Sequence, residues 1–175
     1  GMAIPAVNSE IELPDGELTI PEMLDSSEFD YSSVIVGKWH LVSFSNDSPG
    51  NHPLEQGFLH HMGPIWNPNE SHENQNSPLN YFLWEKSVDG QQSLSETYLT
   101  TDTTNDAINQ VSQLTPPWFV YVAYNAAHEP FHSPPENLIH NALNENPTTK
   151  EQYDAMVEAL DTEIGRLLTS IPIDQ

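Results

Sequence analysis

A lysine and a histidine lie two residues apart directly after an apolar run in this chain. The run covers residues 34–36, Gly37 follows it, and Lys38 and His40 come next. In an extended segment, side chains at positions i and i+2 point the same way, so Lys38 and His40 are predicted to face one ligand while Trp39 faces the opposite side. A cation beside an imidazole suits an oxyanion such as sulfate or phosphate.

A second histidine is predicted at the same edge of the fold. Residues 118–124 form another apolar stretch, and small residues separate it from His128. Lys38, His40 and His128 then meet at the carboxyl ends of two strands, where the lysine supplies fixed positive charge and a histidine supplies a titratable proton. The alternative stays open that Lys38 is solvated and that each histidine satisfies a nearby carbonyl group.

Two other groups of polar residues are candidates for sites. The spacing of four histidines matches no established zinc pattern: His52, His60, His61 and His72. Four carboxylates lie mostly on the polar side of one amphipathic helix, where a solvated face is the expected role: Asp154, Glu158, Asp161 and Glu163. No metal or cofactor is therefore expected to be bound by this chain.

The charge balance limits the class of partner. The 175 residues include 26 acidic and 4 basic side chains, for a net charge of -22. Nucleic acids and anionic membranes bind clustered Lys and Arg, so both are excluded as partners. An acidic surface also repels small anions at long range, so an anion site must depend on local cations such as Lys38.

The compartment is left open by the sequence. The chain has no Cys, so neither a disulfide nor a thiolate zinc site can form in it. It contains no apolar run of about 18 residues and no basic start followed by an apolar segment, so neither a membrane span nor a secretion signal is predicted.

Helices are predicted to alternate with covered strands. In chain order these are a helix over 20–29, a strand over 31–36, a helix over 102–114, a strand over 118–124, and a helix after Thr148. The alternation is typical of an α/β fold with a mostly parallel sheet flanked by helices. We predict a lead-in over residues 1–17 and a single domain over 18–175, with a long polar insertion at about 45–95.

Four segments, in order, resemble the type I sulfatases of the alkaline phosphatase superfamily. They are the helix at 18–24, a Gly-Lys-Trp-His-Leu signature at 37–41, a strand leading to a His-x-Pro turn at 119–130, and the helix at 153–168. The resemblance implies a partial domain of that superfamily and hydrolysis of sulfate esters. It also implies that Lys38 and His40 bind the sulfate oxygens and the leaving group, while His128 contacts the sulfate or protonates the departing oxygen.

The nucleophile and metal ligands of that family have no counterpart in this sequence. Sulfatases make formylglycine from a Cys or Ser in a Cys/Ser-x-Pro-x-Arg motif, but this chain has no Cys and its only arginine is Arg166. The paired aspartates and the Asp-Asn-Gly turn that hold calcium in the family are also missing, as is its second active-site lysine. We therefore expect an internal fragment of a sulfatase that is inactive alone.

Two alternatives stay open on the sequence. One is a non-catalytic anion-binding or assembly fragment, and the other is a phosphate or phosphonate ester hydrolase of the same superfamily. The expected ligand is a sulfate or phosphate ester anion. A homodimer or higher oligomer is predicted to form through exposed sheet edges. The family is often periplasmic or secreted, and this sequence does not decide between compartments.

Overall fold

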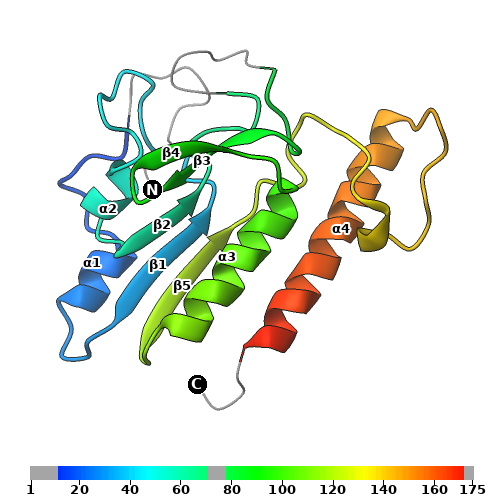
Figure 1. Ribbon diagram of the computed structural model, residues 1–175. Helices are drawn as coiled ribbons and strands as arrows, with labels where there is room; N and C mark the ends of the chain where they lie inside the picture. The colour runs from blue at the N-terminus through cyan, green and yellow to red at the C-terminus, as the bar shows by residue number, and fades with distance from the viewer. Residues whose placement is uncertain (1–11, 71–77, 172–175) are drawn as a thin grey trace.

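The computed structural model describes residues 12–70 and 78–171 (Figure 1). Within them, a five-stranded sheet has the order β4-β3-β2-β1-β5. The strands are β1 (Ser32–Gly37), β2 (His60–Gly63), β3 (Trp84–Val88), β4 (Gln91–Ser95) and β5 (Trp118–Ala123). β1 pairs in parallel with β2 and β5, whereas β3 is antiparallel to both of its neighbours. The predicted α/β fold with helices flanking the sheet is confirmed.

Two of the helices begin where the sequence places their caps, whereas the helix predicted over 102–114 begins three residues earlier, at Leu99. The helices are α1 (Ile20–Asp25), α2 (His52–Glu55), α3 (Leu99–Gln113), the short η1 (Glu136–Leu138) and α4 (Thr149–Ser170). The hydroxyl groups of Thr19 and Thr148 each accept a hydrogen bond from a backbone N–H in the first turn, as the two predicted capping boxes require. α1 ends short of the predicted residue 29. In the part of the chain that the structure describes, none of the helices combines the length and the apolar character needed to cross a membrane.

β1 is buried on both faces, as its uninterrupted apolar run predicts. Val34 and Val36 pack on the face covered by α3, which lies beside α4 in Figure 1. Ile35 packs on the opposite face against Trp39 and Phe58. Burying each such side chain contributes about 1.5–3 kcal/mol. β1 is therefore held on both faces up to the point where Lys38 follows it.

The segment at about 45–95, which the sequence predicts as a long polar insertion, contributes strands to the sheet. It contains α2, β2, β3 and β4. β3 and β4 form a hairpin whose turn residues Asp89 and Gly90 have φ values of 47° and 85°. Positive φ at both positions is typical of a type I′ turn, for which Asp-Gly is a strong sequence signal. The sequence pattern does not predict β2, because this strand is only four residues long and begins with two histidines.

Glu163 differs from the other helix carboxylates, because it is not solvated. It is 1% exposed, and its two carboxylate oxygens accept hydrogen bonds from Thr101 Oγ1 at 2.6 Å and from Arg166 Nε at 2.7 Å. Asp154 and Asp161 are exposed, as predicted for the polar face of α4. The hydrogen bonds that Glu163 and Arg166 make to Thr101 and Asn105 tie α4 to α3, and removal of Arg166 would leave the buried carboxylate of Glu163 without a compensating charge.

β5 is less covered than its apolar sequence predicts. Most of its side chains are half-buried, and Tyr121 is 51% exposed. Among the described strands β5 pairs only with β1, so its other edge presents backbone N–H and C=O groups without a partner strand. Phe119 and Tyr121 also line an apolar groove with Ile20 and Leu41.

We expect the purified chain to self-associate through the β5 edge, because a free strand edge and exposed apolar surface both favour pairing with a second chain. The net charge of -22 opposes this association, and salt screens the repulsion. The oligomeric fraction should therefore rise between about 0.05 and 0.5 M NaCl. Light scattering after size exclusion measures the mass, and a monodisperse monomer at both salt concentrations would contradict the expectation.

Candidate functional site

Lys38 leaves the sheet at the carboxyl end of β1. Its backbone N–H donates to the carbonyl oxygen of Ala123 in β5 at 2.8 Å. The side chain is half-buried, and its Nζ donates to Oδ1 of Asn67 at 2.5 Å. Burial lowers the pKa of Lys38, and the nearby carboxylate of Glu70 opposes that shift. The result is a partly desolvated ammonium group, which attracts an anion more strongly than a fully hydrated one does.

His40 does not lie in an extended segment, so that part of the sequence prediction is wrong. Its φ is 51°, in the left-handed region. The backbone N–H groups of Trp39 and His40 donate to the carbonyl oxygens of Pro64 and Ile65 at 3.1 and 2.7 Å, which turns the chain away from the strand direction. Trp39 nevertheless points away from the candidate site, because it is buried and its Nε1 donates to His52 Nδ1 at 3.0 Å.

The pKa of His40 shows which charges surround it. Burial is the main cause that lowers this pKa to about 4. The charges of Lys38 and His128 lower it further, and Glu70 opposes them. Water and salt screen distant pairs, so the charges that act on His40 lie near it. The structure therefore brings Lys38, His40 and His128 into one neighbourhood, although the route of the chain between Lys38 and His40 differs from the predicted one.

His128 lies on an exposed turn after β5. Its Nδ1 is 2.8 Å from the carbonyl oxygen of Glu129, so Nδ1 is the nitrogen that donates a proton there. Its backbone carbonyl accepts a hydrogen bond from the Tyr81 hydroxyl at 2.8 Å, which anchors the turn to the buried aromatic cluster. The Nδ1 contact orients the exposed ring, and the hydrogen bond from Tyr81 holds the backbone of the turn.

Asn67 and Glu70 belong to this neighbourhood and are not predicted by the sequence. Asn67 is 4% exposed and accepts the hydrogen bond from Lys38. Glu70 in turn accepts from the backbone N–H and from Nδ2 of Asn67, at 3.0 and 3.1 Å. Both residues lie in a stretch rich in Asn and Pro, where nothing in the local pattern distinguishes them from ordinary turn residues.

The four histidines considered as a metal cluster do not act together, since those that the structure describes have separate local partners. His52 Nε2 donates to the carbonyl oxygen of Leu13 at 3.2 Å while its Nδ1 accepts from a tryptophan, which is the pattern of a neutral structural histidine. His61 Nε2 donates to Gly37 O at 3.2 Å, and His60 Nδ1 lies 2.8 Å from Asp89 Oδ2. His72 lies outside the described residues.

In the ranges 12–70 and 78–171, no group of three or more His, Asp or Glu side chains is placed so that it could hold a metal ion. Glu70 is the carboxylate that acts on Lys38 and His40. Both of its oxygens accept hydrogen bonds from Asn67.

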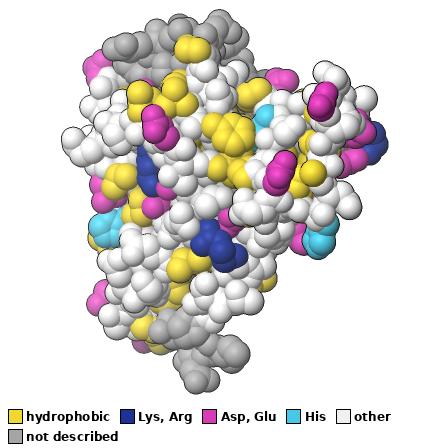
Figure 2. Space-filling model, turned by 45° about the vertical axis from the view of Figure 1, so that its right-hand side comes forward, with side chains coloured by type: hydrophobic (Ala, Val, Ile, Leu, Met, Phe, Trp, Pro, Cys, Tyr) yellow, Lys and Arg dark blue, Asp and Glu magenta, His cyan; other side chains and the backbone are white. Residues whose placement is uncertain are grey.

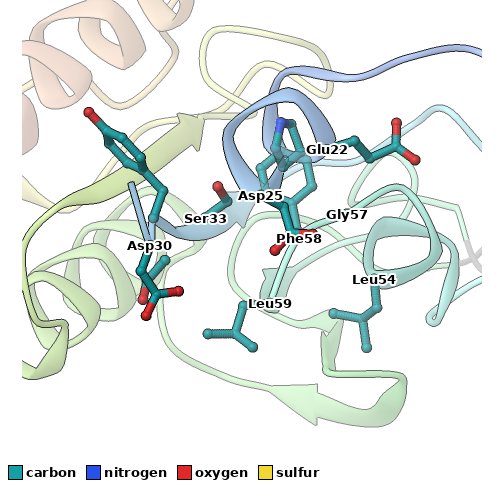
Figure 3. A pocket seen from close by; sticks show the side chains of 11 residues that line it. Glu22, Asp25, Asp30, Ser33, Leu54, Gly57, Phe58 and Leu59 are labelled. Carbon is teal, nitrogen blue, oxygen red and sulfur yellow. The ribbon is translucent and has the colours of Figure 1, made fainter. Parts of the chain in front are cut away.

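A cavity at the amino end of β1 does not suit an anion (Figure 3). Figure 3 shows Glu22, Asp25 and Asp30 among the side chains that line it, together with Ser33 and Phe58. Carboxylates repel sulfate and phosphate. The cavity also lies at the end of β1 opposite the lysine, so it is separate from the candidate anion site.

Acid is expected to destabilise the fold through its buried histidines. Burial lowers the pKa of His61 to about 4, below its ordinary value of 6.5. Between these two values the unfolded chain binds more protons than the folded chain, so the free energy of unfolding falls as the pH falls, by about 3 kcal/mol in total for His61. The pKa of His40 is lowered in the same direction.

Urea unfolding at pH 7 and pH 4.5 measures this effect. His61→Gln cannot titrate, so this variant should lose less stability than the wild type between the two pH values, even if it is less stable at both. Equal losses in the two proteins would show that His61 is not the group responsible.

The chain is similar to known proteins over most of its length. The Sulfatase family model matches residues 2–172. The chain is 28% identical to canine N-acetylgalactosamine-6-sulfatase over 171 residues, covering 90% of this chain and 30% of the relative. It is 30% identical to mouse Arylsulfatase J over 168 residues, covering 91% of this chain and 27% of the relative.

A solved structure shares the fold. The crystal structure of Ps i-CgsB in complex with k-i-k-neocarrahexaose aligns with a TM-score of 0.67 and 24% identity, covering 93% of this chain and 38% of that one. The fold is thus a partial α/β domain of the alkaline phosphatase superfamily. Within that class, the chain belongs to the Sulfatase family. It spans about 30% of the length of the canine relative and 27% of the mouse relative.

Proposed function

We propose that this chain carries the sulfate-binding part of a sulfatase active site, and that the protein to which it belongs hydrolyses sulfate esters. The observation that supports this best is the half-buried ammonium of Lys38 beside His40, whose pKa is lowered by burial and then by Lys38 and His128. These residues follow β1 and β5, and ligands of α/β folds bind at the carboxyl ends of parallel strands.

Each of the three residues has a distinct task in this proposal. Lys38 Nζ donates charge-assisted hydrogen bonds to the sulfate oxygens. His40 is neutral at pH 7 because of its low pKa, so it donates a single N–H to a sulfate oxygen or to the leaving group. His128 contacts the sulfate through Nε2 or, when protonated, gives a proton to the departing oxygen.

The chain by itself binds the ester without turnover in this proposal. Sulfatases attack with formylglycine, and the sequence has no Cys/Ser-x-Pro-x-Arg motif from which that group could be made. Among the described residues, no group of three or more His, Asp or Glu side chains is placed to hold a metal ion. Lys38, His40 and His128 can bind, orient and protonate the ester.

The proposed substrates are sulfate esters of sugars. The name N-acetylgalactosamine-6-sulfatase and the neocarrahexaose bound to Ps i-CgsB support this class. Figure 2 shows Asp and Glu side chains spread over one face of the molecule, with few Lys and Arg side chains among them. Such a surface repels anions at a distance, so capture depends on the local charge of Lys38.

Calorimetric titration of the chain with inorganic sulfate, at low ionic strength, tests the proposal. Saturable binding is expected, and His128→Ala should weaken it. His140→Ala is a matched control, because this exposed histidine pairs with Glu158 away from β5. Failure of sulfate to bind would overturn the proposal, and tighter binding of phosphate than of sulfate would favour the phosphate ester alternative.

A further inference from the structure

Asn67 lies between Lys38 and Glu70 and is hydrogen-bonded to both. Lys38 Nζ donates to its Oδ1 at 2.5 Å. On the other side, Glu70 Oε2 accepts from the backbone N–H of Asn67 at 3.0 Å, and Glu70 Oε1 accepts from its Nδ2 at 3.1 Å. Because Asn67 is only 4% exposed, water cannot readily replace these bonds.

These hydrogen bonds determine which way the Asn67 amide faces. An amide presents an acceptor on one side and two donors on the other, and rotation of the side chain exchanges them. The carboxylate of Glu70 can only accept, so it retains Nδ2 and leaves Oδ1 for Lys38. Without Glu70, Nδ2 of Asn67 can turn toward the ammonium group of Lys38. Two donors then face each other, and Lys38 loses its hydrogen-bond acceptor.

We propose that Glu70 is a positioning residue for the anion site: it orients Asn67, and Asn67 holds Nζ of Lys38 where the oxyanion binds. This inference deepens the proposed function and rests on it for the identity of the ligand. The charged and titratable groups that act on Lys38 and His40 are Glu70, His128 and these two residues themselves.

If Glu70 acted only as a nearby charge, Glu70→Gln would change sulfate affinity in the opposite direction from that expected of a positioning residue. The negative charge of Glu70 repels a sulfate ion, so its removal by Glu70→Gln would tighten sulfate binding if charge were its only effect. If Glu70 orients Asn67, the same variant keeps only one of the two oxygens that accept from Asn67, so Lys38 is held less firmly and sulfate binding weakens by about tenfold, the size of one lost hydrogen bond to a charged group. The sign of the change therefore separates the two roles.

The experiment compares sulfate affinity, at a pH where Lys38 is protonated, in the wild type, Glu70→Gln, Asn67→Ala and the double variant. We expect each single variant to weaken binding and the double variant to be no weaker than Asn67→Ala, because Glu70 acts through Asn67. Glu55→Gln removes an exposed carboxylate on α2 and should bind like the wild type. Unchanged or tighter binding in Glu70→Gln, or additive losses in the double variant, would overturn the proposal.

Nuclear magnetic resonance of the lysine side chains provides a readout that needs no ligand. Removal of the Glu70 carboxylate should lower the pKa of Lys38 further, because burial then acts unopposed. It should also speed exchange of the Lys38 ammonium protons with water. These changes are expected even if sulfate fails to bind, so failure of the proposed function and failure of this inference are distinguishable. An unaltered Lys38 signal in a folded Glu70→Gln variant would overturn the inference.

Discussion

The Lys38→Ala variant is expected to bind sulfate at least about a hundredfold more weakly than the wild type, because it loses charge-assisted hydrogen bonds to the anion. No other cation of the chain can take its place. Lys86, Lys150 and Arg166 are the remaining basic residues, and each of them already pairs with a carboxylate group. Lys38 is instead held by a neutral amide, so its charge is available to a ligand.

Lys150→Ala is the matched control for this prediction. It removes the same unit of positive charge from an exposed position on α4, so the net charge of the two variants is identical. Isothermal titration at low ionic strength should show wild-type affinity for Lys150→Ala and near loss of binding for Lys38→Ala. If both variants bind alike, the affinity depends on overall charge and Lys38 is not the anion ligand.

Gly37→Ala is expected to cost about 3–5 kcal/mol of unfolding free energy, which is most of the stability of an ordinary domain. Gly37 has a φ of +101°, a conformation that costs a residue with a side chain about 1–3 kcal/mol. A Cβ at this position would also lie 2.1 Å from the carbonyl oxygen of Ala123. That oxygen accepts the backbone hydrogen bond of Lys38, so β1 and β5 must separate exactly where the site is built.

Gly165→Ala provides the comparison for Gly37→Ala. Gly165 lies inside α4, and an added Cβ there would meet nothing within 4 Å. Alanine favours a helix over glycine by about 1 kcal/mol, so this variant should be as stable as the wild type or more so. Urea unfolding followed by circular dichroism gives both values. Equal stability of the two variants would mean that the contact between Gly37 and β5 is not as tight as described.

The elements that the sequence predicts well are those with strong local signals. The capping boxes at Thr19 and Thr148 fix the starts of two helices, and the uninterrupted run before Gly37 identifies β1. The same run leads to Lys38, and the apolar stretch of β5 leads to His128. Position along a strand is a local property, so these residues could be proposed as neighbours from sequence alone.

The features that the sequence misses depend on contacts between distant residues. The left-handed His40 is held by the carbonyl group of Ile65, which no local pattern could indicate. Asn67 and Glu70 gain their role only because the chain after β2 returns beside Lys38. β2 itself is short and polar, and it becomes a strand because β1 offers it a parallel edge.

The position of β5 in the sheet has a consequence for the order of folding. β1 ends at Gly37 and its neighbour β5 begins at Trp118, so this pairing closes a long stretch of chain. Long closures are entropically costly and slow, whereas the hairpin of β3 and β4 is local. Until β5 docks, Lys38 lacks the carbonyl group of Ala123 and His128 is not beside it. Anion binding therefore reports the last stage of sheet assembly, and it should appear after most of the helical signal in a refolding experiment.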